Sequence, residues 1–174
     1  MAELLTHVLA AFVLATVASW RIASIDPPLI VACMIGAAIP DLNRVELLFP
    51  AETVTALTGL PWSWGVFHRA GGALLVAIIF ALLVREDFRI PVFAMLMVGI
   101  ASHLVIDYFL WQPTGRTTLM LWPFLDLTLE YQGFYRSSDR WPAAVTIVLA
   151  GVTLLVDRLV IADSTDGART TPTE

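Results

Sequence analysis

The sequence predicts an all-α integral membrane protein, with about five transmembrane helices and a polar site near one membrane face. Of its 174 residues, 58% are apolar and only 14% are charged, and the mean hydropathy is +0.79. A soluble domain is usually about half apolar and about a quarter charged. The apolar residues fall into runs separated by short polar stretches. Such runs are typical of helices that lie in a bilayer.

Five apolar runs give the expected helices, in chain order. The first ends at Trp20 and Arg21, an aromatic and cationic pair typical of the membrane interface. The second opens with two prolines and closes at Pro40, so it is short for a full span and we expect a tilted or broken helix. The fourth run contains two ionisable residues, which are unusual inside an apolar segment. The expected helices cover residues 4–20, 27–39, 70–84, 90–111 and 141–161.

The segments between and after these helices are expected to stay at or outside the membrane surface. Residues 42–65 and 112–140 mix apolar patches with tryptophans, which favours segments that lie on the interface. Residues 163–174 are small and polar, so we expect a disordered tail after one integral membrane domain over residues 1–162. Glu3 stands where a signal peptide would carry basic residues, so residues 4–20 are interpreted as a transmembrane helix.

Composition also excludes some functions. The formal net charge of -5 and the absence of a basic patch argue against a nucleic-acid partner, so the bilayer is the expected partner. One cysteine, Cys33, excludes an intrachain disulfide, and its apolar surroundings predict a small buried side chain. Nothing in the sequence predicts an oligomeric state.

His103 and Asp107 form an ionisable pair inside the fourth apolar run. They are four residues apart, so they share one face of a helix. Ionisable side chains inside a membrane helix are costly unless they are paired, bind a metal or face a polar cavity. By themselves they are equally compatible with hydrogen bonds that hold neighbouring helices together.

Five crossings would bring further polar residues to the same side of the membrane as this pair. The chain has three histidines. His7 lies near the start of the first helix, Asp41 follows the end of the second, and His68 precedes the third. The second half of the fourth helix returns to this side. The predicted metal ligands are therefore His7, Asp41, His68, His103 and Asp107.

Three imidazoles and two carboxylates suit a divalent transition metal, most naturally zinc, with manganese or iron as alternatives. Three or four protein ligands would leave a position at which a water is acidified to a nucleophile. Asp41 or Asp107 is the candidate general base. Arg69 is the preferred partner for an anionic substrate, with Arg44 and Arg116 as further candidates.

Several short motifs, in this order, resemble the inner-membrane-associated metal-dependent hydrolases of the YdjM type. They are Thr6-His7, G-A-A-I-P-D at residues 36–41, His68-Arg69, S-H-L-V-I-D at residues 102–107 and P-T-G-R-T-T-L-M-L-W-P-F at residues 113–124. The resemblance spans most of residues 6–124. It implies an all-helical membrane protein with a proposed hydrolytic metal site, similar to those of zinc enzymes that cleave phosphoesters.

The sequence departs from this family pattern at two positions. Asn43 stands where a second carboxylate is usual, and Ala73 stands where a further histidine is common. The loss of two donors is compatible with one metal instead of two, with weaker binding or with lost catalysis.

Three functions are therefore compatible with the sequence. The first is a membrane-embedded metal-dependent hydrolase of a phosphoester or lipid-like substrate. The second is a non-enzymatic membrane protein whose cluster binds a metal or conducts an ion or proton. The third is a cluster that only fixes helix packing.

Arginine density predicts the orientation of the chain in the membrane. Ten arginines divide equally between the two sides on the five-span topology, but Arg21, Arg85 and Arg89 are concentrated in two short turns. Positive charge counts most in short loops near the spans and marks the cytoplasmic side. We therefore expect the N-terminus and the polar cluster to face outward in the cell membrane.

Overall fold

The computed structural model describes residues 2–111, 117–119, 121–125, 127–129 and 133–169, and most of them are helical. The only strands in these ranges are two short antiparallel ones. In chain order the elements are α1 (Ala2–Ser19), α2 (Pro27–Ala38), η1 (Pro40–Leu47), α3 (Ala51–Thr58), η2 (Trp64–His68), α4 (Ala70–Leu83), α5 (Glu86–Tyr108), β1 (Thr117–Leu119), β2 (Leu127–Leu129) and α6 (Trp141–Arg169).

All five helices expected from the apolar runs are present, as α1, α2, α4, α5 and α6. Two of them pass a predicted boundary by several residues. Helix α5 begins at Glu86, so it includes most of the polar stretch that was expected to be a turn, and Glu86 and Asp87 stabilise its positive N-terminal end. Helix α6 continues to Arg169, past the boundary predicted at residue 162. Extending a formed helix by a residue is far easier than nucleating one. Residues 170–174 of the predicted tail lie outside the described residues.

Of the roughly five transmembrane helices predicted, the second of them short or broken, the structure supports two or three as spans by length and composition. Only two described helices are long and apolar enough to cross a membrane, Glu86–Tyr108 and Trp141–Leu159. A third crossing is added if α2 and η1, which meet at a bend of 53°, act as one broken span. Helices α1 and α4 are apolar but shorter. The 14 residues of α4 reach about 21 Å, whereas the hydrocarbon core is about 30 Å thick.

The bend after α2 follows from its sequence. Asp26 begins the helix by accepting a hydrogen bond from the Leu29 backbone N–H at 3.2 Å, and proline occupies the first turn, where its missing N–H is not needed. Pro40 then interrupts the helix after Ile39 and starts the tighter turn of η1. The bend therefore places Asp41 directly beyond the end of an apolar helix.

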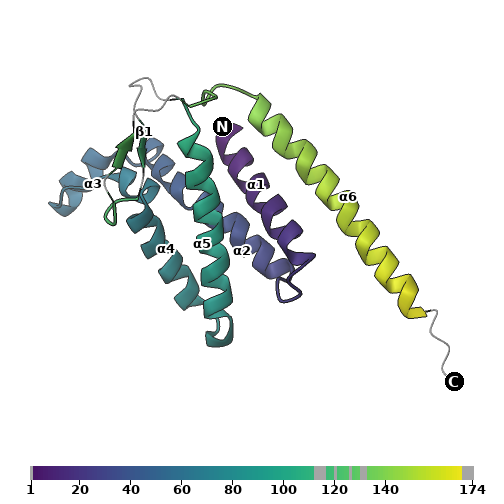
Figure 1. The fold of residues 1–174 in the computed structure, drawn as a ribbon. Coiled ribbons are helices and arrows are strands. Elements are labelled where there is room, and N and C mark those ends of the chain that lie inside the picture. The colour runs from purple at the N-terminus through teal and green to yellow at the C-terminus, as the bar shows by residue number, and fades with distance from the viewer. Residues whose placement is uncertain (1, 112–116, 120, 126, 130–132, 170–174) are drawn as a thin grey trace.

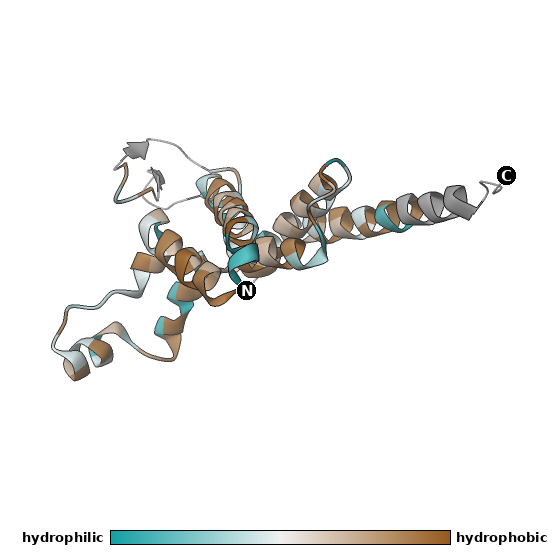
Figure 2. Cartoon of the chain, turned by 90° about the horizontal axis from the view of Figure 1, so that it is seen from below, coloured by the Kyte–Doolittle hydropathy of each residue, from teal (hydrophilic) through white to brown (hydrophobic). Residues whose placement is uncertain are grey.

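Helix α5 lies at the centre of the bundle, between α2 and α4, and α1 packs between α2 and α6 (Figure 1). The start of α1, the end of α5 and helix α3 lie at the same end of the bundle. Hydrophobic residues predominate on these helices in Figure 2. At the opposite end of α1, the Trp20 indole donates a hydrogen bond to Asp157 of α6 at 3.0 Å.

Helices α2 and α5 pack closely because each has a glycine at their contact. A Cβ atom at Gly36 would overlap the backbone carbonyl of Leu96, and one at Gly99 would overlap the carbonyl of Cys33. Small residues allow such close approach of two membrane helices. Cys33 is fully buried there and is not in a disulfide, as the sequence predicted.

The segment expected to be an interfacial loop over residues 42–65 is partly helical. It contains most of η1, the whole of α3 and the start of η2, and it exposes large apolar side chains: Leu47 is 85% exposed and Leu57 is 82% exposed. Helix α3 ends at Gly59, whose positive φ of 71° is easily reached only by glycine. That this segment lies on a membrane surface stays a prediction.

The glycine contact gives a prediction about stability. Gly99→Ala should lower the free energy of unfolding in detergent by roughly 1 to 3 kcal/mol, because the added methyl group overpacks the contact between α2 and α5. The same change at Gly151 of α6, where an added methyl group would meet no heavy atom within 4 Å, should be neutral or stabilising by up to about 1 kcal/mol. Thermal unfolding of both variants measures the difference, and equal melting temperatures would contradict the close approach.

Candidate metal centre

The three histidines of the chain converge on one carboxylate, that of Asp107. Nε2 of His7 lies 3.1 Å from Oδ1, and Nε2 of His68 lies 2.9 Å from Oδ2. Nε2 of His103 lies 3.2 Å from Oδ2. These side chains come from α1, η2 and α5, which are far apart in the sequence. The convergence predicted from topology is confirmed for all three imidazoles.

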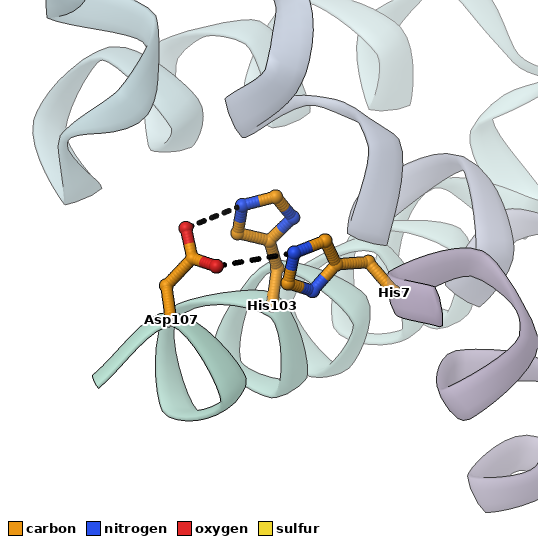
Figure 3. Close-up of side chains that lie close together, drawn as sticks. All are labelled: His7, His103 and Asp107. Carbon is orange, nitrogen blue, oxygen red and sulfur yellow. Dashed lines mark ion pairs between the residues drawn. The ribbon is translucent and has the colours of Figure 1, made fainter. Parts of the chain in front are cut away.

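The cluster is almost closed to solvent. The side chains of His7 and His103 are 2% and 0% exposed, and that of Asp107 is 10% exposed. The rings of His7 and His103 stack, with centroids 3.7 Å apart, and both lie beside the Asp107 carboxylate in Figure 3. The His68 side chain is 17% exposed, so it is the most accessible of the three.

Backbone carbonyls fix the protonation of two of these rings. Nδ1 of His103 lies 2.7 Å from the carbonyl oxygen of Ala37, and Nδ1 of His68 lies 3.1 Å from that of Pro40. A carbonyl oxygen only accepts hydrogen bonds, so each Nδ1 must carry the proton. In the neutral rings, both Nε2 atoms are then unprotonated, with their lone pairs available to a ligand.

Lone pairs that face a carboxylate repel it unless a positive charge lies between them. For His68, burial lowers the pKa, but the hydrogen bond and negative charge of Asp107, with smaller contributions from Pro40 and Asp41, raise it more. The net pKa is above the ordinary value for histidine. At His103, Nε2 is buried without a properly directed hydrogen bond, although the carboxylate is close. The cluster therefore requires added protons or a cation.

Asp41 belongs to a second group of donor atoms in the cluster. Donor atoms of Asp41, His68 and His103 lie within 4.8 Å of one another, as do those of His7, His103 and Asp107. Oδ1 of Asp41 accepts a hydrogen bond from Nε of Arg44 at 2.9 Å, whereas Oδ2 is buried without a partner. The structure thus brings together all five side chains that the sequence predicted as ligands.

The donor set fits a divalent transition metal. It offers imidazole nitrogens and carboxylate oxygens in two overlapping groups of three that share His103. Zinc sites use such donors, and catalytic ones commonly have three protein ligands. Two ring nitrogens are already oriented by hydrogen bonds to backbone carbonyls, which is the usual support for metal-binding histidines. That these five residues bind a metal stays a prediction.

The three arginines predicted to bind an anionic substrate differ in their positions relative to the cluster. Arg44 pairs with Asp41 and is partly exposed, so it borders the cluster. Arg69 is exposed, and its guanidinium lies over the ring of Trp122, 5.7 Å from the centroid. Its sequence neighbour His68 is in the cluster, but no described contact joins Arg69 to the Asp107 carboxylate. Arg116 lies outside the described residues.

The two departures from the family pattern occupy different surroundings. Asn43 has a buried side-chain oxygen without a hydrogen-bond partner. Ala73 is fully buried in an apolar core with Ile39 and Ile100. A histidine at residue 73 would therefore not fit unless the surrounding core moved. An aspartate at residue 43 would fit, because its side chain has nearly the same size as that of asparagine.

Two participants were not found from the sequence, the backbone carbonyls of Ala37 and Pro40. Every residue has a carbonyl, so the sequence carries no signal for which one orients a histidine. Only the packing of α2 against α5 and of η1 against η2 selects them.

The comparison with known proteins agrees with a membrane protein. The sequence model of the family described as YdjM inner membrane protein matches residues 1–169. No curated protein and no solved structure was found to match the chain. Since the match covers nearly the whole chain and confirms the resemblance seen in the motifs, the chain belongs to the YdjM inner membrane protein family.

Proposed function

We propose that this protein is a membrane-embedded metal-dependent hydrolase that acts on a phosphoester or lipid-like substrate at the membrane interface. The observation that supports this most is the convergence of three Nε2 atoms on the Asp107 carboxylate, with the protons of His68 and His103 held on the opposite ring nitrogens. With its imidazoles neutral, a cluster of this kind is electrostatically unfavourable in a buried site. A bound cation removes the repulsion.

The metal ligands would be drawn from His7, His68, His103, Asp41 and Asp107. Zinc is the first choice for this mixed set, and manganese and iron are alternatives. A divalent metal bound there supplies Lewis-acid chemistry, acidifying a water and neutralising charge on a phosphoryl group.

The protein's own side chains would carry out the remaining steps. Asp41 is the preferred general base, because Oδ2 is buried without a hydrogen-bond partner while Oδ1 is held by Arg44. Asp107 is the other carboxylate that is able to hold the proton. Arg69 is exposed beside His68 and is placed to attract an anionic group that approaches from the membrane surface. The carbonyls of Ala37 and Pro40 keep the imidazoles oriented.

We further propose that α1 and α4 cross the membrane although they are short. Both are apolar, and both pack against longer partners, α1 against α6 and α4 against α5. Short spans are accommodated by local thinning of the bilayer. With the pair α2 and η1 returning to the side on which α1 began, the cluster would lie near the outer face.

A non-enzymatic role is the alternative. His7 and His103 are almost completely buried, which restricts the approach of a large substrate but not of an ion or proton. In that case the cluster would bind a metal or pass an ion without hydrolysis.

Metal content and turnover test the proposal together. Protein purified without chelators should contain about one zinc, manganese or iron ion per chain and should cleave a generic phosphoester. His103→Ala should lower metal occupancy more than about tenfold and abolish turnover. Thr16→Val changes another buried polar side chain of the bundle, and it should preserve both.

Elemental analysis and a phosphoester assay on the same samples separate the outcomes. Metal without turnover supports the alternative function. Protein that holds no metal, or metal that remains after His103→Ala, contradicts the site itself.

Asn43 gives a second test of the site. Asn43→Asp adds a carboxylate of nearly the same size where a buried oxygen lacks a partner, so the affinity for zinc should rise. Competition with a chelator of known affinity measures the change. Asn43→Leu is the control without a donor and should not bind zinc more tightly than the natural protein. An unchanged or lower affinity of folded Asn43→Asp would show that residue 43 does not face the metal.

The topology is tested by cysteine labelling on intact cells. In a Cys33→Ala background, single cysteines replace Glu52 in α3 and Asp87 at the start of α5, both of which are exposed. Only α4 among the apolar helices lies between them. An impermeant maleimide should label Glu52→Cys and not Asp87→Cys. The opposite pattern would reverse the orientation, and labelling of both residues would show that α4 does not cross.

A further inference from the structure

A large apolar cavity lies beside the histidine cluster, on the side of α4. Its volume is about 500 Å³, and its wall is formed by α5, the start of α4 and one residue that follows β1. The lining side chains are apolar apart from the hydroxyl group of Tyr108. They include Ala70, Met97, Ala101, Leu104, Tyr108 and Leu121.

The cavity is elongated along α5. Met97, Ala101, Leu104 and Tyr108 recur at spacings of four, three and four residues, which places them on one stripe of the helix. From Met97 to Tyr108 this stripe covers about 16 Å along the helix axis. Residues 104 and 108 directly follow His103 and Asp107, so the two stripes are turned by about 100° from each other around α5 at the same level along the helix.

One end of this elongated cavity lies at the level of the site along α5 and is the polar end. Tyr108 follows Asp107, and Ala70 is two residues after His68. Arg69 and Trp122 are the chain neighbours of the lining residues Ala70 and Leu121, and the Arg69 guanidinium lies over the Trp122 ring, so this pair is close to that end. A positive charge therefore lies at one end of an otherwise apolar cavity.

The side of the cavity is accessible from the bilayer. Ala101 and Val105 line it and are exposed, with Val105 57% exposed. Both belong to α5, one of the two described helices that are long enough to cross a membrane. Exposed apolar residues of a membrane-spanning helix face lipid chains, so a ligand would enter laterally.

We propose that this cavity binds the acyl chain of an anionic phospholipid, with the phosphate held by Arg69 at the end nearest Asp107. An apolar cavity of this size with a polar group at one end is typical of a ligand site, and the guanidinium complements a phosphate. The placement of that phosphate beside the histidines rests on the proposed function and names its substrate class as a lipid phosphoester. Binding of the chain itself does not depend on a metal.

Lipid binding tests the proposal directly. The protein in nanodiscs of zwitterionic lipid is titrated with radiolabelled palmitoyl lysophosphatidic acid. Ala101→Phe fills the cavity from its exposed side and should weaken binding by at least about tenfold. Ala94→Phe is the matched control: it is also an exposed alanine of α5, seven residues earlier on the same face, but it does not line the cavity. Equal affinities of the two variants would overturn the proposal.

Chain length gives a second readout that a folding defect does not mimic. Met97 lies at the end of the cavity away from Asp107. Met97→Trp should shorten the cavity, so that decanoyl lysophosphatidic acid is preferred over the palmitoyl lipid. An unchanged preference in protein that retains its melting temperature would contradict the assignment.

The headgroup is tested by competition. Monopalmitoylglycerol has the chain without the phosphate and should compete weakly, and inorganic phosphate has no chain and should also compete weakly. Arg69→Gln should weaken binding of lysophosphatidic acid while leaving that of monopalmitoylglycerol unchanged. Equal affinity for the two lipids would overturn the phosphate contact, and full competition by inorganic phosphate would overturn the acyl-chain site.

The same titration on His103→Ala separates this inference from the proposed hydrolase. Binding of the acyl chain should persist in this variant. If the natural protein binds the lipid but holds no metal and hydrolyses no phosphoester, the lipid site is supported and the proposed hydrolase is overturned. Metal-dependent turnover of soluble phosphoesters without lipid binding would support the hydrolase and overturn the lipid site.

Discussion

The structure depends on how one buried negative charge, the Asp107 carboxylate, is balanced. A carboxylate at this depth is strongly destabilised without compensation. Three segments place an imidazole against it, from α1, η2 and α5, and α1 and α5 also pack against each other. Assembly of the site is therefore linked to the packing of these two helices.

The rest of the polar arrangement follows from the close contact of α2 with α5. Gly36 and Gly99 let the two backbones approach, and this brings the Ala37 carbonyl to the His103 ring. The carbonyl fixes a proton on Nδ1 and directs Nε2 at Asp107. A preorganised ring loses little entropy when it binds a ligand, which favours metal binding over a merely structural hydrogen bond.

The sequence was sufficient to predict the positions of the helices and the residues that form the polar cluster. His103 and Asp107 were recognised because they interrupt an apolar run at helical spacing, and His7, Asp41 and His68 because alternating helices return to the same side. It was not sufficient for the number of spans. The short run over residues 70–84 and the break at Pro40 were both recognised, but apolar composition does not show whether a helix of 14 residues, or a pair bent by 53°, crosses the bilayer.

Other features depended on packing that no local pattern encodes. The position of Arg69 over Trp122 joins segments far apart in the chain, so its neighbour His68 was a poor guide to it. The cavity along α5 is another example, since its lining residues look like any lipid-facing helix in the sequence. Such features arise from which helices are neighbours and how closely they approach.

The hydrogen bond between His103 and Ala37 affects which substitutions at residue 103 can be tolerated during evolution. Ala37 lies in the last turn of α2, a turn without a basic residue, where the helix dipole is negative and carbonyls lack partners within the helix. The imidazole N–H thus caps α2. A chain that lost its chemistry would still need a donor at this position to keep that helix end satisfied. Retention of His103 in a relative is therefore weak evidence of activity, whereas retention of Asp41, which has an unpartnered oxygen and caps nothing, is more informative.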